Sequence, residues 1–390
     1  GVIRSYELLE ARKIDGGEQF FTRAIDFGYS KSAEESFDFW GKDEVLHDVV
    51  YVIRKFRPHM IITRFPPTRR AGHGHHEASA ILAEEAFDLA ADPNAFPEQL
   101  KTMEIWQPEY LYHNTSSCWD KSLDDLDAAG LKGRNMLRVD VGVYNDLLGY
   151  SMNEIASLAR SKHRCQAFGT MRARGSQSEY LALVKGEWTD RPFEDAKGLW
   201  KQSPGHAAAL AKVVDEFDFT DRNANFGNLK RNFYPMMAQR NMWAEAQDMN
   251  GVMTKINDLK LDISGIRVEV SAGQDAVVIG SDYEVTVEVF NSSKDSQTVD
   301  FKHIVIDSIV TVGPMESISW TETFKAPSNP SNPFWLVNTY QGWLYGIDKE
   351  SEIGLPYKLD EVIQYVIKVD NQFVKGESTL HRKWRDRSIG

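Results

Sequence analysis

The chain has 390 residues, a hydrophobic fraction of 42% and a formal net charge of −12. This length predicts two or three domains, each large enough to bury a core. The negative charge argues against non-specific nucleic-acid binding, which requires a basic surface. The two cysteines, Cys118 and Cys165, are too few for a disulfide framework or a cysteine-rich zinc site.

No run of 18 apolar residues is present, so we expect no membrane span. The first residues lack the pattern of a signal peptide and enter a helix-like stretch directly. They therefore give no indication of the compartment.

Helix and strand signals alternate over the first ~145 residues, which predicts an α/β fold. Capping boxes at residues 32–35 and 151–154 mark two helix starts. Pro58 ends a third helix. The expected helices cover residues 5–14, a short stretch from residue 32, residues 43–57, residues 76–91 and a stretch from residue 151. The expected strands cover residues 20–27, 59–65, 109–113 and 137–143.

The pattern changes twice further along the chain. Residues 205–259 are helical and rich in aromatic side chains, and from residue 261 onward apolar and polar residues alternate. Short strands, as at residues 283–289, 303–306 and 362–369, separated by turn signals are typical of a β-sandwich. We therefore expect an α/β domain over residues 1–200, a helical connecting region over 201–260 and a β-sandwich-like domain over 261–390.

Three histidines, His73, His75 and His76, lie within four residues between an expected strand and an expected helix. Open α/β folds place their chemistry at such junctions. One of His73 and His76 could hold a metal while the other transfers a proton. A purely polar, solvent-facing helix start is the alternative. For His75, a hydrogen bond that tunes its neighbours and a structural role are equally compatible with the sequence.

The loop that precedes the histidines carries two guanidinium groups, on Arg69 and Arg70. Arginine recognises anionic or polyhydroxyl ligands well, so Arg70 is a candidate substrate contact. A solvated loop explains the same residues equally well.

These segments resemble the zinc-dependent N-acetylglucosaminyl deacetylases of the PIG-L/LmbE type, in particular a large bacterial subgroup with extra C-terminal domains. The Gly-His-Gly-His-His run at residues 72–76 is similar to the Gly-His-Pro-Asp-His motif of the family. Residues 3–7 resemble its Ile-Arg-x-x-Glu helix, and residues 163–166 stand where it has His-x-Ser-Gln. Residues 144–156 resemble its late helix, so that the resemblance covers about residues 1–170.

The resemblance implies a Rossmann-like, mostly parallel sheet and a site for Zn²⁺. It implies that His76 is a zinc ligand and that His73 acts as the acid and stabilises the tetrahedral intermediate. It also implies that Arg4 contacts the substrate and that Asp26 binds sugar hydroxyls. Members of the subgroup are often exported, so a periplasmic or extracellular location is an expectation by resemblance alone.

Two departures from the family pattern concern the histidine motif and the start of the sheet. Gly74 and His75 stand where the family has Pro and Asp. The His-Pro-Asp-Asp motif, which supplies two zinc ligands and the general base, is not found before the helix at residues 3–7. We therefore expect N-terminal strands to be missing, and zinc binding to be weak or absent in this chain.

The sequence thus predicts a zinc-dependent de-N-acetylase that acts on an N-acetylglucosamine-type conjugate and has little or no activity as this chain alone. The alternative is a non-catalytic protein that binds a glycan and has lost the metal. A third possibility is glycan attachment by the C-terminal aromatic residues, although packing of these rings in a core is the simpler explanation. These aromatic residues are Trp320, Trp335, Tyr340 and Trp343.

Overall fold

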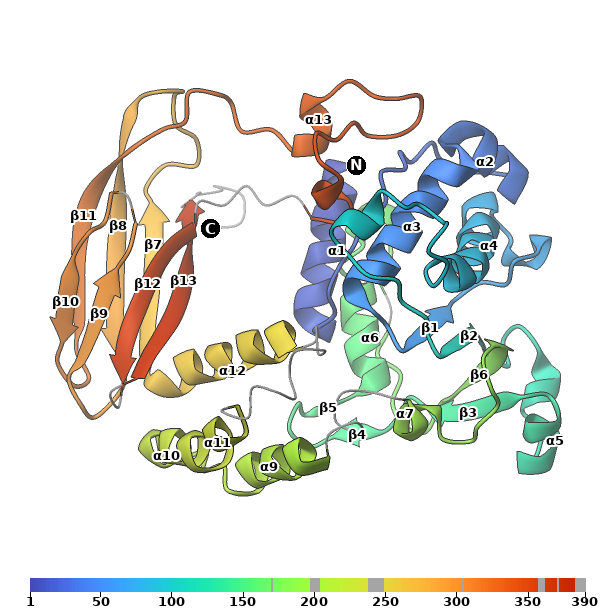
Figure 1. Ribbon diagram of the computed structural model, residues 1–390, viewed down its shortest axis with the longest axis horizontal. Helices are drawn as coiled ribbons and strands as arrows, with labels where there is room; N and C mark the ends of the chain where they lie inside the picture. Colours follow the sequence, from blue (N-terminus) through green and yellow to red (C-terminus); the bar gives the residue numbers. More distant parts are fainter. Residues whose placement is uncertain are drawn as a thin grey trace. The chain divides into compact units, whose positions relative to one another are not determined.

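The computed structural model describes residues 1–169, 171–196, 204–237, 249–303, 305–356, 362–369 and 372–382 (Figure 1). The chain divides into two compact units. Unit 1 comprises Gly1–Lys197 and Asn332–Lys358, and unit 2 comprises Gly198–Ser331 and Leu359–Gly390. This differs from the predicted division. The helical region belongs to unit 2, and a stretch of the expected β domain belongs to unit 1.

Unit 1 is built around a pair of amphipathic helices, α3 and α4. Val45, Val50 and Ile53 of α3 pack against Leu82 of α4 in one hydrophobic core, which also contains Leu344 from the second segment of unit 1. The helices of unit 1 are α1 (Val2–Asp15), α2 (Ala33–Trp40), α3 (Lys42–Phe56), α4 (Gly74–Leu89), α5 (Ala128–Gly133), α6 (Met152–Arg160), α7 (Pro192–Asp195) and α13 (Phe334–Val337). Short 3₁₀ turns are η1 (Arg69–Ala71), η2 (Gln99–Lys101), η3 (Lys121–Leu123), η4 (Arg164–Gln166) and η6 (Glu350–Glu352).

The helix starts follow the capping signals of the sequence. Ser32 precedes α2, and its hydroxyl accepts a hydrogen bond from the backbone N–H of Glu35. Ser151 and Glu154 form the complete reciprocal capping box of α6. Gly16 ends α1 in the left-handed conformation, with φ of 72°. These expected helices are therefore confirmed.

The sheet of unit 1 has the order β1-β2-β6-β3 and mixes parallel with antiparallel pairing. Strands β1 and β2 are parallel, and β6 pairs antiparallel with both β2 and β3. The predicted predominance of parallel pairing is therefore not seen in the described residues, because β6 runs back between β2 and β3. The strands of unit 1 are β1 (Met60–Thr63), β2 (Tyr110–Thr115), β3 (Met136–Asp140), β6 (Ser178–Lys185) and the two-stranded ribbon of β4 (Tyr144–Asn145) and β5 (Tyr150–Ser151).

The strand predicted at residues 20–27 is wrong. This segment pairs with the later stretch of unit 1 at isolated points. Phe21 N–H donates to the carbonyl of Gly354 at 3.2 Å, Ile25 N–H to that of Trp343 at 2.9 Å, and Tyr345 N–H to that of Arg23 at 2.8 Å. A single β-bridge joins Ala24 to Leu344. Its extended conformation is therefore stabilised by a distant segment without a continuous strand ladder.

Within its described residues, unit 2 combines four helices with one nearly closed seven-stranded sheet of the order β10-β9-β12-β13-β7-β8-β11. Strand β13 pairs with both β12 and β7, and β10 also contacts β8, so the strands enclose a single core. This is one continuous sheet, in contrast to the two sheets of the expected sandwich. Its elements are α9 (Pro204–Asp215), α10 (Arg222–Asn232), α11 (Tyr234–Met237), α12 (Met249–Ser264), β7 (Ile266–Ala272), β8 (Asp282–Asn291), β9 (Gln297–Phe301), β10 (Ile309–Val312), β11 (Ser317–Lys325), β12 (Val362–Val369) and β13 (Gln372–Arg382).

The alternation of apolar residues along these strands fills the core of unit 2. Val285, Val287 and Val289 of β8 point inward and are fully buried. The strand predicted at residues 303–306 is not formed at its described positions, because the N–H of His303 bonds to the carbonyl of Ile306 in a turn between β9 and β10.

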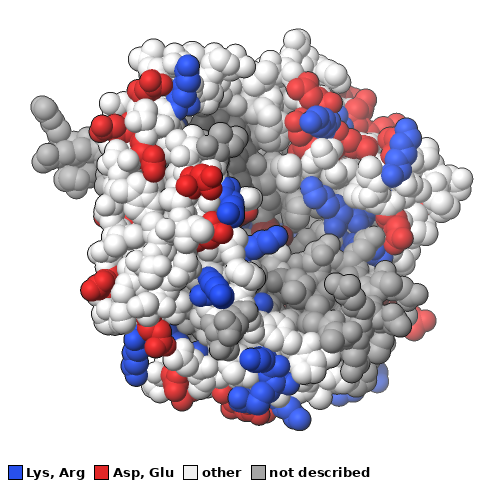
Figure 2. Space-filling view, turned by 60° about the vertical axis from the view of Figure 1, so that its left-hand side comes forward, with Lys and Arg blue, Asp and Glu red and all other residues white. Residues whose placement is uncertain are grey.

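Two surface properties bear on partners. None of the described helices is both long and apolar enough to cross a lipid bilayer. Acidic and basic side chains both occur on the face drawn in Figure 2.

Candidate functional site

The histidine loop, residues 72–76, connects the carboxyl end of β1 to the start of α4. Gly72 adopts a left-handed conformation with φ of 77° and turns the chain after η1. His73 is the N-cap residue of α4, and His75 and His76 lie in its first turn. The predicted junction of strand and helix therefore carries the cluster.

The hydrogen bonds of His73 and His76 assign opposite proton positions to the two rings. Nδ1 of His73 accepts the backbone N–H of His75 at 3.2 Å, so in the neutral ring the proton lies on Nε2. Nδ1 of His76 lies 3.3 Å from the carbonyl of Ala71, which can only accept, so the lone pair of His76 lies on Nε2. The ring centroids are 5.1 Å apart. One ring is therefore set up as a donor and the other as a ligand or base.

The ring of His76 is partly buried and stacks on Phe65. Its ring lies parallel to Phe65, with centroids 3.7 Å apart and an interplanar angle of 4°. Burial lowers the pKa of His76, and the nearby charge of His73 lowers it further, against the opposing effect of the Ala71 carbonyl. A neutral imidazole is the form that binds metals.

His75 faces a different environment from the other two histidines. Its ring stacks on Trp40 at 4.4 Å and lies edge-on to Phe27 at 4.5 Å. Its Nδ1 lies 3.1 Å from the hydroxyl of Ser36, and its Nε2 is 3.8 Å from a carboxylate oxygen of Asp26. Burial, followed by the charge of His73, lowers the pKa of His75. Nε2 of His75 is buried and has no hydrogen-bond partner among the described groups.

Gly74 explains why the loop can depart from the Gly-His-Pro-Asp-His pattern. Its N–H donates to the carbonyl of Ser30 at 2.8 Å, a bond that proline cannot make. A Cβ at this position would lie 2.2 Å from the carbonyl oxygen of Ser32. The close approach of the two backbones therefore requires glycine here.

Two segments that the resemblance singled out separately meet in space. Arg4 pairs with Glu7, and its guanidinium lies 3.0 Å from Nδ1 of His163. The carboxylate of Glu7 accepts the backbone N–H of Cys165 at 2.7 Å and its thiol at 2.9 Å. These bonds to Cys165, more than the pairing with Arg4, lower the pKa of Glu7 to about 2.

A cavity of about 220 Å³ in unit 1 brings together Arg4 and Asp26, two predicted substrate-binding residues. Its wall includes Trp335 and Ile353 from the second segment of unit 1. Asp26 also lies 3.8 Å from His75, but His73, His75 and His76 are not among the residues that line this cavity. The combination of apolar walls with a few charged groups is typical of a small-molecule site.

Arg70 and two of the aromatic residues considered for glycan attachment lie in places that give little support for a role in binding. Arg70 is exposed in η1 and does not line the cavity. Of the aromatic residues considered for glycan attachment, Trp320 packs partly against the core of unit 2. Trp343 belongs to unit 1, where its ring lies 5.1 Å from that of Phe39. Packing therefore accounts for Trp320, whereas Trp343 remains 40% exposed.

The histidine loop provides one ligand position for Zn²⁺ and does not complete a site. His76 fits such a position because its Nδ1 is held by a carbonyl and its Nε2 carries the lone pair. A catalytic zinc site needs about three protein ligands. Among the described residues, the one group of three potential ligand atoms within 4.8 Å of one another is His47, Glu98 and Glu350, away from the loop.

His113 is a residue that sequence analysis undervalued. It lies within β2, in register with Thr63 at the end of β1, and its Nδ1 is buried without a hydrogen-bond partner among the described groups. Burial lowers its pKa. A polar residue at the carboxyl end of a parallel strand was the available signal.

Neither a known family model nor a curated protein matches the chain.

Proposed function

We propose that unit 1 binds an N-acetylglucosamine-type conjugate and forms the substrate-binding part of a zinc-dependent de-N-acetylase of the PIG-L/LmbE type. The observation that carries this proposal is the opposite hydrogen-bonding roles of His73 and His76, together with a cavity that Arg4 and Asp26 line and that the histidines themselves do not line. The parallel pair of β1 and β2, connected through α4, supports a Rossmann-like arrangement of this part.

The side chains divide the work of amide hydrolysis between them. Asp26 accepts hydrogen bonds from sugar hydroxyls, and Arg4 donates to polar groups of the substrate. Nε2–H of His73 donates a hydrogen bond to the oxygen that gains charge in the tetrahedral intermediate. His76 would hold a zinc ion, which would supply the polarisation of an acetamide carbonyl and the activation of water.

A sugar-binding measurement tests this assignment. The full chain is titrated with the methyl glycoside of N-acetylglucosamine, with and without Zn²⁺. We expect Asp26→Asn to weaken binding by about 10–100-fold, since it replaces a charge-assisted hydrogen bond. Asp38→Asn is the matched control, because Asp38 is exposed and lies outside the cavity. Equal affinities of both variants and the unchanged chain would contradict the proposal.

The second candidate function is a carbohydrate-binding protein without catalysis. It is favoured by the single zinc-ligand position that the described residues offer at the histidine loop. The metal dependence of sugar binding separates the two candidates. A de-N-acetylase site predicts that Zn²⁺ tightens binding of the N-acetyl glycoside and that His76→Ala abolishes this gain. Binding that is unchanged by chelator and by His76→Ala supports the second candidate. In either case we expect little or no acetate release by this chain alone.

A further inference from the structure

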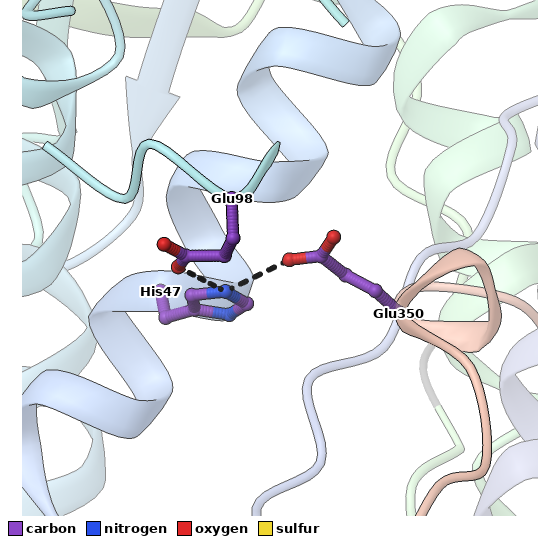
Figure 3. A group of neighbouring side chains, drawn as sticks. All are labelled: His47, Glu98 and Glu350. Atoms are coloured by element: carbon purple, nitrogen blue, oxygen red, sulfur yellow. Dashed lines mark hydrogen bonds and ion pairs between the residues drawn. The ribbon is translucent and has the colours of Figure 1, made fainter. Parts of the chain in front are cut away.

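A second group of potential metal ligands lies in unit 1, formed by His47 of α3, Glu98 just before η2 and Glu350 of η6 (Figure 3). Nε2 of His47 lies 3.2 Å from a carboxylate oxygen of Glu98 and 3.1 Å from one of Glu350. Both carboxylates therefore point at the same ring nitrogen, although the three residues come from segments far apart in the sequence.

These separations match the edges of a metal coordination shell. Zinc binds imidazole nitrogen and carboxylate oxygen at about 2.0–2.2 Å, so neighbouring ligand atoms in a tetrahedral site are roughly 3.3 Å apart. The three ligand atoms here all lie within 4.8 Å of one another. A small movement of the two glutamate side chains would bring them to ligand distance of one ion.

A buried carboxylate beside Nδ1 of His47 orients the imidazole ring. Nδ1 of His47 lies 3.4 Å from Asp48, whose side chain is fully buried. Asp48 in turn accepts hydrogen bonds from the backbone N–H and the guanidinium of Arg23, at 2.8 and 2.9 Å. A carboxylate on one imidazole nitrogen directs the lone pair of the other nitrogen outward, an arrangement that recurs at metal sites.

The loop that carries Glu98 is also held in place before any ion binds. The buried guanidinium of Arg54 donates to backbone carbonyls of this loop, including those of Ala95 at 2.8 Å and Phe96 at 3.2 Å. The side-chain amide of Gln99 donates to the carbonyl of His47 at 3.0 Å, which ties the loop to α3. Because these bonds already order the loop, binding of an ion would require little further loss of conformational entropy.

Charge around the cluster favours a cation. Arg23 pairs with Asp48 and so does not neutralise the two glutamates. In the ion-free chain, a proton on Nε2 of His47 would be shared by the two carboxylates that face it, and a dication that binds this nitrogen would replace that proton. The side chains of Glu98 and Glu350 are 45% and 32% exposed, which leaves an entry path for an ion and room for water ligands.

We propose that His47, Glu98 and Glu350 form a binding site for a transition-metal dication of the Zn²⁺ class, which fastens the second segment of unit 1 to α3 and to the loop before η2. One imidazole and two carboxylates suit such ions better than Mg²⁺, which favours oxygen ligands and retains its waters.

In the test, the full chain is first freed of metal with a chelator. It is then titrated with ZnCl₂ in an isothermal titration calorimeter. We expect Glu350→Gln and His47→Gln to remove one equivalent of zinc or to weaken its binding by at least about tenfold. Glu104→Gln is the matched control, because the side chain of Glu104 is 71% exposed and lies outside the cluster. Zn²⁺ should raise the melting temperature of the unchanged chain and of this control, and leave that of Glu350→Gln unaffected.

A separate variant distinguishes this site from the histidine loop. His76→Gln should retain the equivalent of zinc that Glu350→Gln loses. The proposal is overturned if His76→Gln abolishes all zinc binding while Glu350→Gln preserves it. It is also overturned if the unchanged chain binds no zinc, since the cluster would then be an ion-pair network only. Circular dichroism on Glu350→Gln, whose exposed position tolerates an isosteric amide, confirms that loss of binding does not reflect unfolding.

Discussion

Replacement of Arg54 by methionine tests how the loop after α4 is held. The side chain of Arg54 is 1% exposed. It donates hydrogen bonds to the carbonyls of Leu89, Ala90, Asp92, Ala95 and Phe96 and to the side chain of Gln99. Arg54→Met fills a similar volume but leaves these acceptors without their donor. Removal of one partner from a buried charged network costs about 3–5 kcal/mol.

The cost of Arg54→Met is measurable as a shift in unfolding. For a unit of this size, about 3–5 kcal/mol corresponds to a decrease in melting temperature of about 6–20 °C. Scanning calorimetry gives this shift, and hydrogen exchange should show faster exchange over residues 90–99. Arg69→Met is the control, because the side chain of Arg69 is 78% exposed and should contribute less than about 0.5 kcal/mol. A loss below about 1 kcal/mol for Arg54→Met would refute this account of the loop.

Three further predictions concern backbone packing, thiol reactivity and pH. Gly74→Ala should lower the free energy of unfolding, measured in urea, by about 1–3 kcal/mol, because its Cβ would lie 2.2 Å from a backbone atom. Gly133→Ala is the control and should be neutral or slightly stabilising, because the space around Gly133 is open. Equal effects of the two variants would contradict the close packing at position 74. The hydrogen bond to Glu7 raises the pKa of the Cys165 thiol, so Glu7→Gln should speed alkylation of Cys165 by iodoacetamide severalfold at pH 8, and an unchanged rate would argue against this bond. Burial lowers the pKa of His113 below 6.5, so NMR should find its midpoint below that value. Between 6.5 and the lowered pKa, the unfolded chain binds a proton at His113 that the folded chain does not bind. The stability that neutral His113 contributes should therefore be lost as the pH falls from 6.5 through the lowered pKa. A midpoint at or above 6.5 would contradict this sign.

Local signals in the sequence were sufficient for most helices of unit 1. The capping box of Ser151 and Glu154 predicts the start of α6 correctly, because both of its hydrogen bonds lie within four residues. The segment at residues 20–27 looked like a strand, but what pairs with it is a stretch more than 300 residues later, which no local pattern indicates. Parallel pairing was overestimated for the same reason, since strand order depends on distant contacts.

The candidate sites show the same contrast. His73, His75 and His76 stand together in the sequence, so their proximity could be predicted. Glu98 and Glu350 are glutamates in ordinary loop contexts, and their convergence on one ring nitrogen depends on the return of the chain to unit 1. Sequence spacing alone carries no trace of that arrangement.

The return of residues 332–358 to unit 1 has a consequence for how the protein can be made and divided. A fragment that stops near residue 200 would lack Leu344 in its core, Trp335 at its cavity and Glu350 at its ion-binding cluster. During synthesis, unit 1 cannot be completed until most of unit 2 has emerged from the ribosome. Expression of residues 1–197 alone is therefore expected to give an incompletely folded product, and the two units must be produced as one piece.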